Sequence, residues 1–328
     1  MDPIASTLET LTLGEALIHK NLALFPLFGA HGSLVDYVTL DEALASGGAR
    51  VTEISSGGSV PELAFANDGE TAVFLLDGEE LVGAKQNRIL NLSMLVAPKS
   101  TVAIPVSCVE SGRWAYSSDQ FSSSRHAHFS RGRASKAASV SANMRESGDR
   151  ISNQSEVWAD VDARSADLGV HSPTSAISDV FASHEADLEA FVEQIQPDAD
   201  HAGAVFCIGG EIAGMDIFDK PQTFAKLTAK LVRSYGLDAI DGNVDRPPTC
   251  EKIEKFLGLV GATKPDVHPA VGLGQDLRLS VADLSGGALE LDSTIIHLCA
   301  FPKAQDGEIG SRYGARGARM ARASDRRR

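Results

Sequence analysis

The chain lacks long apolar runs and is poor in aromatic side chains. No stretch of eighteen consecutive apolar residues occurs among its 328 residues, so the sequence predicts no transmembrane helix. The N-terminus, MDPIASTLETLTLGEAL, is acidic and lacks the basic segment with which a secretory signal begins. We therefore expect a cytoplasmic protein that makes no contact with a membrane.

Cysteine is scarce, and its spacing excludes two common uses of this residue. The four cysteines, Cys108, Cys207, Cys250 and Cys299, lie far apart and form no CxxC pair. This spacing excludes a zinc ribbon and a thioredoxin-type site. Because all except Cys250 lie in or beside apolar runs, we expect buried thiols in a reducing compartment.

Signatures of well-known catalytic and nucleotide-binding sites are also missing. The sequence contains no P-loop, no GxGxxG after a strand-like segment, no GxSxG, no HExxH and no kinase signature. His126 and His128 have a spacing that suits two metal ligands, but no third ligand accompanies them. The sequence therefore gives no reason to expect a metal or a cofactor.

Negative charge dominates the chain, except at its end. The formal net charge is −14. Residues 303–328 contain eight basic and three acidic residues, so this Arg-rich tail carries +5 and the preceding residues carry −19. A body this acidic repels polyanions, which disfavours nucleic acid as its partner. We expect the tail to be disordered. A merely solvated extension is the favoured interpretation, and binding to an acidic partner, to nucleic acid without specificity or to the acidic body is the alternative.

The order of apolar segments predicts an α+β fold built from two parts. Residues 10–116 contain short strand-like runs separated by turn residues, which indicates a β-rich part folded as a sandwich or a partial barrel. Residues 133–302 alternate helical patterns with hairpins, one of them turning at Gly209-Gly210. We expect both parts to form one body, residues 1–302.

Four local patterns give more detailed expectations. Asp77-Gly78 is typical of a two-residue hairpin turn. Residues 117–133 are Ser-rich and aperiodic, which predicts a long loop. Residues 173–195 carry apolar side chains at helical spacing, which predicts one long helix. Ser285-Gly286-Gly287 is expected to form the turn of a final hairpin.

Two strand-like runs within residues 77–116 lead from apolar into charged side chains. Side chains alternate between the two faces of a strand. In the first run, this alternation places Glu80 and Arg88 on the same face as Leu90. In the second run, it places Glu110 on the face of Val106. A buried charge is costly unless it is paired, reaches water or meets a ligand.

Three explanations of these charges stay open. A β-bulge near Gly83 would shift the register and turn Arg88 outward. Arg88 and a glutamate would otherwise form a buried structural ion pair. The third explanation is a ligand-binding or catalytic pocket at the ends of the two strands.

The pocket explanation assigns candidate roles to nine residues. Glu80 and Glu110 are the candidate catalytic acid and base, since carboxylates near cations can separate their pKa values for hydrolysis. Cys108 is a candidate nucleophile, with a buried strand cysteine as the alternative. The candidate ligand-binding residues are Lys85, Gln86, Asn87, Arg88, Arg113 and Trp114. Cations of this kind clamp a phosphate or a carboxylate, and an indole stacks on a ring.

With these residues in view, the chain resembles the ARG and rhodanese-phosphatase-superfamily-associated protein domain family. The resemblance is carried by five segments: GEELVGAKQNRILN (78–91), IPVSCVESGRW (104–114), SEVW (155–158), LGVHSPTSAISDV (168–180) and GMDIFDKPQTFAKLTAKLVRSYGLDAI (214–240). Through the associations in its name, the family implies ADP-ribose, nucleotide or phosphate chemistry. The resemblance assigns no role to any residue.

The residues and the resemblance together lead to one functional hypothesis with two alternatives. We expect the protein to bind a small anionic ligand, nucleotide-like or ADP-ribose-like, in a pocket built by residues 78–91 and 104–114. Hydrolysis of that ligand is open, and a sensor that only binds it uses the same residues. The alternative from another class is a non-catalytic assembly subunit, in which the polar residues form an interface between copies of the chain.

Overall fold

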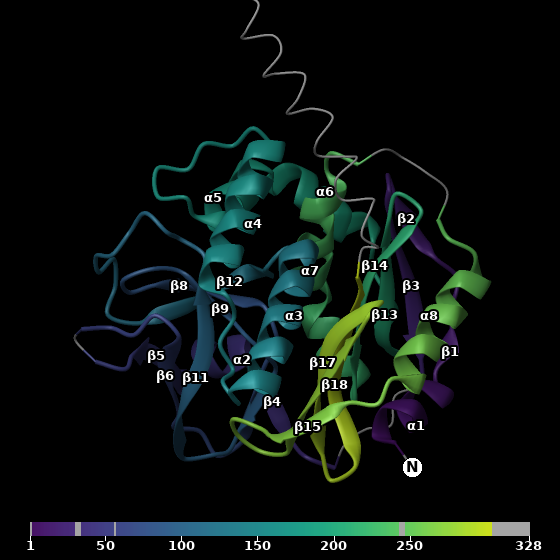
Figure 1. The fold of residues 1–328 in the computed structure, drawn as a ribbon, viewed down its shortest axis with the longest axis horizontal. Helices are drawn as coiled ribbons and strands as arrows, with labels where there is room; N and C mark the ends of the chain where they lie inside the picture. Colours follow the sequence, from purple (N-terminus) through teal and green to yellow (C-terminus); the bar gives the residue numbers. More distant parts are fainter. Residues whose placement is uncertain (1, 30–33, 56, 243–246, 304–328) are drawn as a thin grey trace, which may run out of the picture.

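The computed structural model describes residues 2–29, 34–55, 57–242 and 247–303. The expected α+β class is confirmed, and the first half is rich in strands. A closed barrel and a larger sheet lie side by side, with helices α3 and α7 between them (Figure 1). Within the described ranges, no helix is long and apolar enough to cross a membrane. The predicted basic tail lies outside the described residues from residue 304 onward.

Six strands close the barrel in the order β11-β6-β5-β12-β8-β9. They are β5 (Ala49–Glu53), β6 (Glu62–Asn67), β8 (Glu79–Gly83), β9 (Arg88–Leu90), β11 (Ser100–Cys108) and β12 (Phe121–Ala127). Ile104 and Val106 of β11 pack with Leu81 of β8 in one apolar cluster. The barrel is therefore closed, where the sequence indicated a sandwich or a partial barrel. Its weakest seam joins β5 and β12 through a single residue pair, Val51 and Phe121.

A three-stranded sheet packs against the barrel and shares its apolar cluster. It consists of β4 (Tyr37–Thr39), β7 (Ala72–Leu75) and β10 (Met94–Val96), and a capping box starts the adjoining helix α2 (Leu40–Ala45). The hairpin predicted at Asp77-Gly78 is wrong. The chain turns there, with Gly78 at a φ of 79°, but β7 pairs with β10 while β8 joins the barrel. The local pattern specified the turn and not the strand partners.

The second half builds a nine-stranded sheet that also takes in the N-terminal strands. Its strands are β1 (Thr12–Leu13), β2 (Leu17–His19), β3 (Leu22–Phe28), β13 (His201–Ile208), β14 (Glu211–Phe218), β15 (Asp266–Pro269), β16 (Gln275–Val281), β17 (Leu284–Leu291) and β18 (Thr294–Pro302). Strand β3 pairs with β13 over seven residue pairs. The first strands of the predicted β-rich half therefore belong to the sheet of the other half. The hairpin at Gly209-Gly210 is present between β13 and β14, with both glycines at positive φ.

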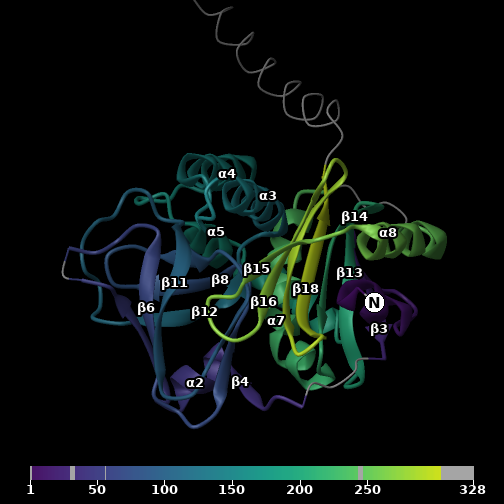
Figure 2. The ribbon, with the colours of Figure 1, turned by 60° about the horizontal axis from the view of Figure 1, so that its bottom comes forward.

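Eight helices surround and separate the two bodies of strands. Besides α2, they are α1 (Pro3–Glu9), α3 (Ser130–Glu146), α4 (Gln154–Asp167), α5 (Ile177–Ser183), α6 (Glu185–Gln194), α7 (Pro221–Ala239) and α8 (Cys250–Ala262), all within the described residues. Helix α7 is buried along most of its length because it packs between β12 of the barrel and β13 of the sheet. Helices α1 and α8 cover the outer face of the sheet, and α4 and α5 lie over one end of the barrel (Figure 2).

The helix predicted over residues 173–195 is two helices. Helix α5 ends at Ser183, and His184 leaves the helical conformation with a φ of −117° and a ψ of 20°. Phe181 of α5 packs in the cluster beside the barrel, whereas Phe191 of α6 packs in the cluster beneath the large sheet. The apolar stripe is thus divided between two helices, and Leu188 of α6 also packs in the cluster that contains Phe181.

One predicted loop and one predicted turn contain strand residues instead. Residues 121–127 of the Ser-rich segment form β12, which pairs with β8 and completes the barrel. Gly286 and Gly287 lie inside β17, and the chain turns instead at residues 282–283. A Cβ at Gly287 would lie 2.2 Å from Nη1 of Arg278. Glycine at position 287 therefore leaves room for the side chain of the neighbouring strand and does not form a turn.

A buried ionic cluster joins the barrel side to the large sheet. Arg133 of α3 donates two hydrogen bonds to Asp216 of β14, at 3.0 and 2.6 Å, and one to Asp77 at 3.3 Å. Lys136 binds the other oxygen of Asp77 at 2.6 Å. Burial raises the pKa of Asp77, but the charges of Lys136 and Arg133 outweigh it and leave this pKa below its usual value. Both carboxylates are thus held as anions between the two halves.

Candidate functional site

The connection between β8 and β9 determines which face each candidate side chain occupies. Gly83 and Ala84 have φ values of 135° and 40°, so the chain leaves the extended conformation before β9 begins. Glu80 pairs with Ile89, and Leu81 pairs with Arg88. Directly paired residues share a face, so Glu80 and Arg88 lie on opposite faces. The expectation that they share one face is wrong, because alternation does not continue through a turn.

Arg88 lies at one end of the barrel on its inner face, with its side chain fully buried. Its Nη1 donates a hydrogen bond to Oε1 of Gln86 at 2.9 Å. Its Nε and Nη2 have no hydrogen-bond partner among the described residues. The Trp114 ring covers the guanidinium, with its centroid 5.7 Å from Cζ. Burial lowers the pKa of Arg88, and the neighbouring Cys108 and Glu53 only partly oppose this effect.

Glu110 is fully engaged by its surroundings. Arg113 binds both of its oxygens, at 2.8 and 2.6 Å. The backbone N–H of Asn87 and the hydroxyl of Thr174 donate further hydrogen bonds to the carboxylate. Burial raises the pKa of Glu110, but these hydrogen bonds outweigh it and leave the pKa below its usual value. The carboxylate is therefore held in its charged form.

Arg113 fixes the loop that connects β11 to β12. Besides Glu110, its guanidinium donates hydrogen bonds to the backbone oxygens of Ala84 and Ala115, at 2.6 and 2.9 Å. It also reaches Oγ of Ser117 at 3.1 Å. The loop carries Trp114 between these anchored points. Arg113 thus acts as a support for this loop, and its donors are all directed at the protein.

Lys85 joins the same end of the barrel to two aromatic rings. Its Nζ donates a hydrogen bond to the backbone oxygen of Gly57 at 2.6 Å. The same ammonium lies 5.2 Å from the ring centroid of Trp114 and 5.1 Å from that of Tyr116. Both rings remain about half exposed, at 49% and 52%. Two cations and two aromatic rings therefore meet at the mouth of the barrel.

Gln86 and Cys108 complete the floor of this site. Oε1 of Gln86 accepts from Arg88 and lies 3.1 Å from Sγ of Cys108. The thiol is fully buried, and burial raises its pKa. Cys108 is thus adjacent to the site as a neutral thiol, which is the weakly nucleophilic form. Its proposed role as a nucleophile stays a prediction.

Glu80 lies outside this group, on the barrel face covered by α5. Its carboxylate is buried, and Nε2 of His126 is 2.5 Å from Oε2. The His126 ring stacks on Phe181, with centroids 3.5 Å apart. The structure therefore brings together Arg88, Glu110 and their neighbours but separates Glu80 from them. Within the described residues, no group of three or more His, Cys, Asp or Glu side chains is arranged to hold a metal ion.

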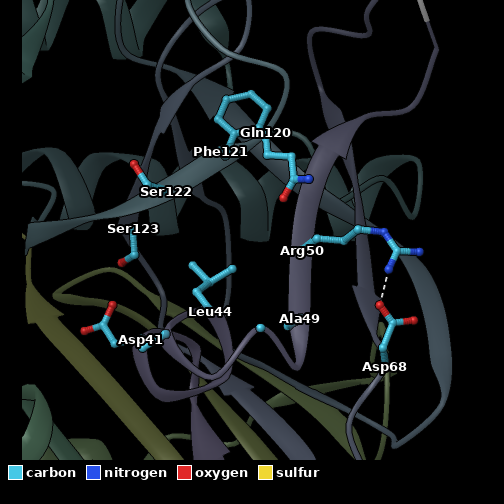
Figure 3. Close-up of a pocket in the computed structure, with 11 residues that line it drawn as sticks. Asp41, Leu44, Ala49, Arg50, Asp68, Gln120, Phe121, Ser122 and Ser123 are labelled. Carbon is cyan, nitrogen blue, oxygen red and sulfur yellow. Dashed lines mark hydrogen bonds and ion pairs between the residues drawn. The ribbon is translucent and has the colours of Figure 1, made fainter.

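A cleft of about 560 Å³ lies on the side of the barrel where β5 and β12 part (Figure 3). Its lining includes Asp41 and Leu44 of α2, Arg50 of β5 and Ser123 of β12. Sequence reasoning gave no signal for this cleft, because its residues come from three stretches that lie far apart in the sequence, 41–50, 68 and 120–123. Arg50 is paired with Asp68, and Asp41 with the buried Lys230, so its charged groups are already satisfied.

Sequence reasoning also missed a serine–histidine–aspartate arrangement between the two halves. Oγ of Ser93 lies 2.8 Å from Nδ1 of His297, and Nε2 of His297 lies 3.3 Å from Oδ1 of Asp216. All three are buried, Ser93 with 8% exposure. Asp216 is also bound by Arg133 through both oxygens. These features indicate a structural hydrogen-bond chain, since a nucleophilic serine needs an accessible hydroxyl.

The fold and site define an α+β protein whose closed barrel ends in a buried guanidinium beneath exposed aromatic rings. The chain belongs to the ARG and Rhodanese-Phosphatase-superfamily-associated Protein domain family, whose model matches residues 10–301. The resemblance seen in the sequence is therefore confirmed. No curated protein and no solved structure matched the chain.

Proposed function

We propose that this protein binds a small anionic ligand at the barrel end, with Arg88 as its main cationic contact. The observation that supports this proposal is the pair of guanidinium nitrogens that have no acceptor among the described residues. A buried cation without hydrogen bonds is costly. A phosphate or carboxylate would supply the missing acceptors in the planar geometry that arginine favours. Trp114 covers this position, with about half of its side chain exposed.

Nucleotide-like and ADP-ribose-like molecules are the anions that we include in this proposal. Binding is better supported than hydrolysis, because Glu110 is committed to Arg113 and Glu80 faces the other side of the barrel wall. We therefore assign the site a ligand-binding role and no reaction step. Nζ of Lys85 lies 5.2 Å from the centroid of the Trp114 ring and adds positive charge beside Arg88.

Titration calorimetry of Arg88→Met against inorganic phosphate, AMP and ADP-ribose tests the proposal. Two lost charge-assisted hydrogen bonds at about 1.5–3 kcal/mol each predict at least about a hundredfold loss of affinity. Arg145→Met is the matched control, since Arg145 is an exposed arginine paired with Asp266 far from the barrel end. The control should bind as the wild type does. Equal affinities of Arg88→Met and wild type would contradict the proposal.

We include two further properties in this proposal. The four cysteines lie in the described part of the chain as free thiols, three of them buried, which supports a reducing cytoplasmic location. The sequence also led us to propose a homo-oligomer. Light scattering on the purified chain tests this state, and a monomer at all concentrations would exclude it.

A further inference from the structure

We propose that the ligand carries a planar ring next to its anionic group, as nucleoside phosphates do, and that Trp114 and Tyr116 bind the ring. This inference rests on the proposed function and specifies what the ligand carries besides its charge. We refer to Trp114 and Tyr116 as the aromatic pair. Three features of the pair support the proposal: its exposure, its rigid support and its position beside two cations.

The exposure of the aromatic pair is unusual for this chain. Only two tryptophans and four tyrosines occur in the sequence, yet one of each is about half exposed within the same short loop. Single exposed apolar side chains need no explanation, whereas grouped ones mark binding surfaces. These two are grouped, since both rings lie within 5.2 Å of Nζ of Lys85.

The loop that carries the aromatic pair is held in place before any ligand arrives. Arg113 binds the backbone oxygen of Ala115, which lies between the two rings in the sequence, and Oγ of Ser117, which follows them. Its other donors reach Glu110 and the backbone of Ala84. Such support lowers the cost of ordering on binding. Arg113 is therefore a positioning residue for the pair.

The Trp114 ring lies over both Arg88 and Lys85, and the Tyr116 ring lies over Lys85. The Trp114 centroid is 5.7 Å from Cζ of Arg88 and 5.2 Å from Nζ of Lys85. A ligand that places its phosphate on the guanidinium therefore brings any attached ring against the indole. Stacking on an aromatic side chain tolerates any base, because every base has a π-face. The geometry thus selects for a ring without specifying which one.

A small molecule fits these observations better than a protein surface does. The unsatisfied nitrogens of Arg88 are fully buried, so only a small group that passes Trp114 can reach them. A protein partner would cover the aromatic pair from outside and leave the guanidinium as it is. A small molecule that depends on both Arg88 and the aromatic pair for its binding would distinguish this proposal from a protein partner.

Calorimetry with AMP and ribose 5-phosphate at one ionic strength tests the inference, because the two ligands share a phosphate and a ribose and differ in the ring. Stacking on one base predicts that wild type binds AMP about 5- to 150-fold more tightly. Trp114→Ala should lose most of this difference, with ribose 5-phosphate affinity within about twofold of wild type. Val267→Ala, an exposed apolar residue on β15, is the matched control.

Each outcome of this experiment has a definite meaning. Equal wild-type affinities for the two ligands would overturn the ring-binding role and leave the anion site in place. An equal loss of both ligands in Trp114→Ala would also overturn it, since the indole would then act only on the anion. If wild type bound neither AMP, ribose 5-phosphate nor inorganic phosphate, the proposed function itself would be wrong.

Discussion

Replacing Arg88 or Arg133, two of the buried arginines, by methionine should affect stability differently. Arg133 satisfies Asp216 and Asp77, and its removal leaves buried carboxylates short of a partner. Removing one member of a buried ion pair costs about 3–5 kcal/mol. Arg88 makes one hydrogen bond, to Gln86, and a bond from a charged group contributes about 1.5–3 kcal/mol.

The desolvation of Arg88, in contrast to its hydrogen bond, lowers the stability of the folded protein. Its guanidinium is buried with two nitrogens unpaired, and an uncompensated buried ion costs several kcal/mol. Methionine has a similar length, removes this cost and keeps an apolar contact with Trp114. We therefore expect Arg88→Met to be neutral or to stabilise the protein by up to about 3 kcal/mol. The residue would then be retained for its ligand at the expense of stability.

Urea denaturation followed by circular dichroism measures both effects from the shift in midpoint at constant slope. Arg133→Met should shift the midpoint to lower urea, and Arg88→Met should leave it unchanged or raise it. A loss of 2 kcal/mol or more in Arg88→Met would refute the reasoning, since it would make Arg88 a structural residue like Arg133.

Three further predictions concern other parts of the molecule. Burial raises the pKa values of Asp77 and Asp216, but Lys136 and Arg133 at Asp77, and Arg133 and His297 at Asp216, outweigh it and leave both pKa values depressed. The stabilising contribution of these two carboxylates is therefore present above about pH 4 and is lost as pH falls below it. Acid titration of unfolding should show this loss, and its absence would exclude the ionised cluster. A thiol reagent should modify only the exposed Cys250 in the native protein and all four thiols after denaturation, and rapid native labelling of more than one thiol would contradict the described burial. Gly287→Ala should destabilise the protein by about 1–3 kcal/mol in thermal unfolding, because the added methyl group would overlap with the guanidinium of a buried arginine on β16. An unchanged midpoint would show that this arginine moves aside freely.

The sequence was informative about elements and less informative about their partners. Strand-like runs, the Gly209-Gly210 turn and the α+β class follow from local periodicity, which the fold preserves. The assignment of β7 and β8 to different sheets does not follow, because the turn at Asp77-Gly78 is compatible with either arrangement. Pairing between strands is decided by contacts distant in sequence.

The candidate site shows the same limit. Charged residues beside apolar runs correctly indicated buried polar groups, and Arg88, Gln86 and Glu110 are all buried near one another. A register shift near Gly83 is one of the explanations that the sequence leaves open, but it would turn Arg88 outward. The structure instead keeps Arg88 inside and turns Glu80 away, with the backbone irregular at Gly83 and at Ala84, whose positive φ a non-glycine residue rarely adopts. The support given by Arg113 to the aromatic pair also depends on backbone oxygens, which carry no sequence signal.

The pairing of β3 with β13 sets an order for events during protein synthesis. Strand β3 ends at Phe28 and its partner begins at His201, with the whole barrel encoded between them. At ribosomal rates the N-terminal strand waits roughly ten to thirty seconds for its neighbour. During this interval the apolar side chains of Leu22–Phe28 are present in the nascent chain without their final cover. The barrel strands can pair in that time, so we expect the barrel to form before the N-terminal strand pairs with β13. The N-terminal strand is therefore where a nascent-chain chaperone would be needed.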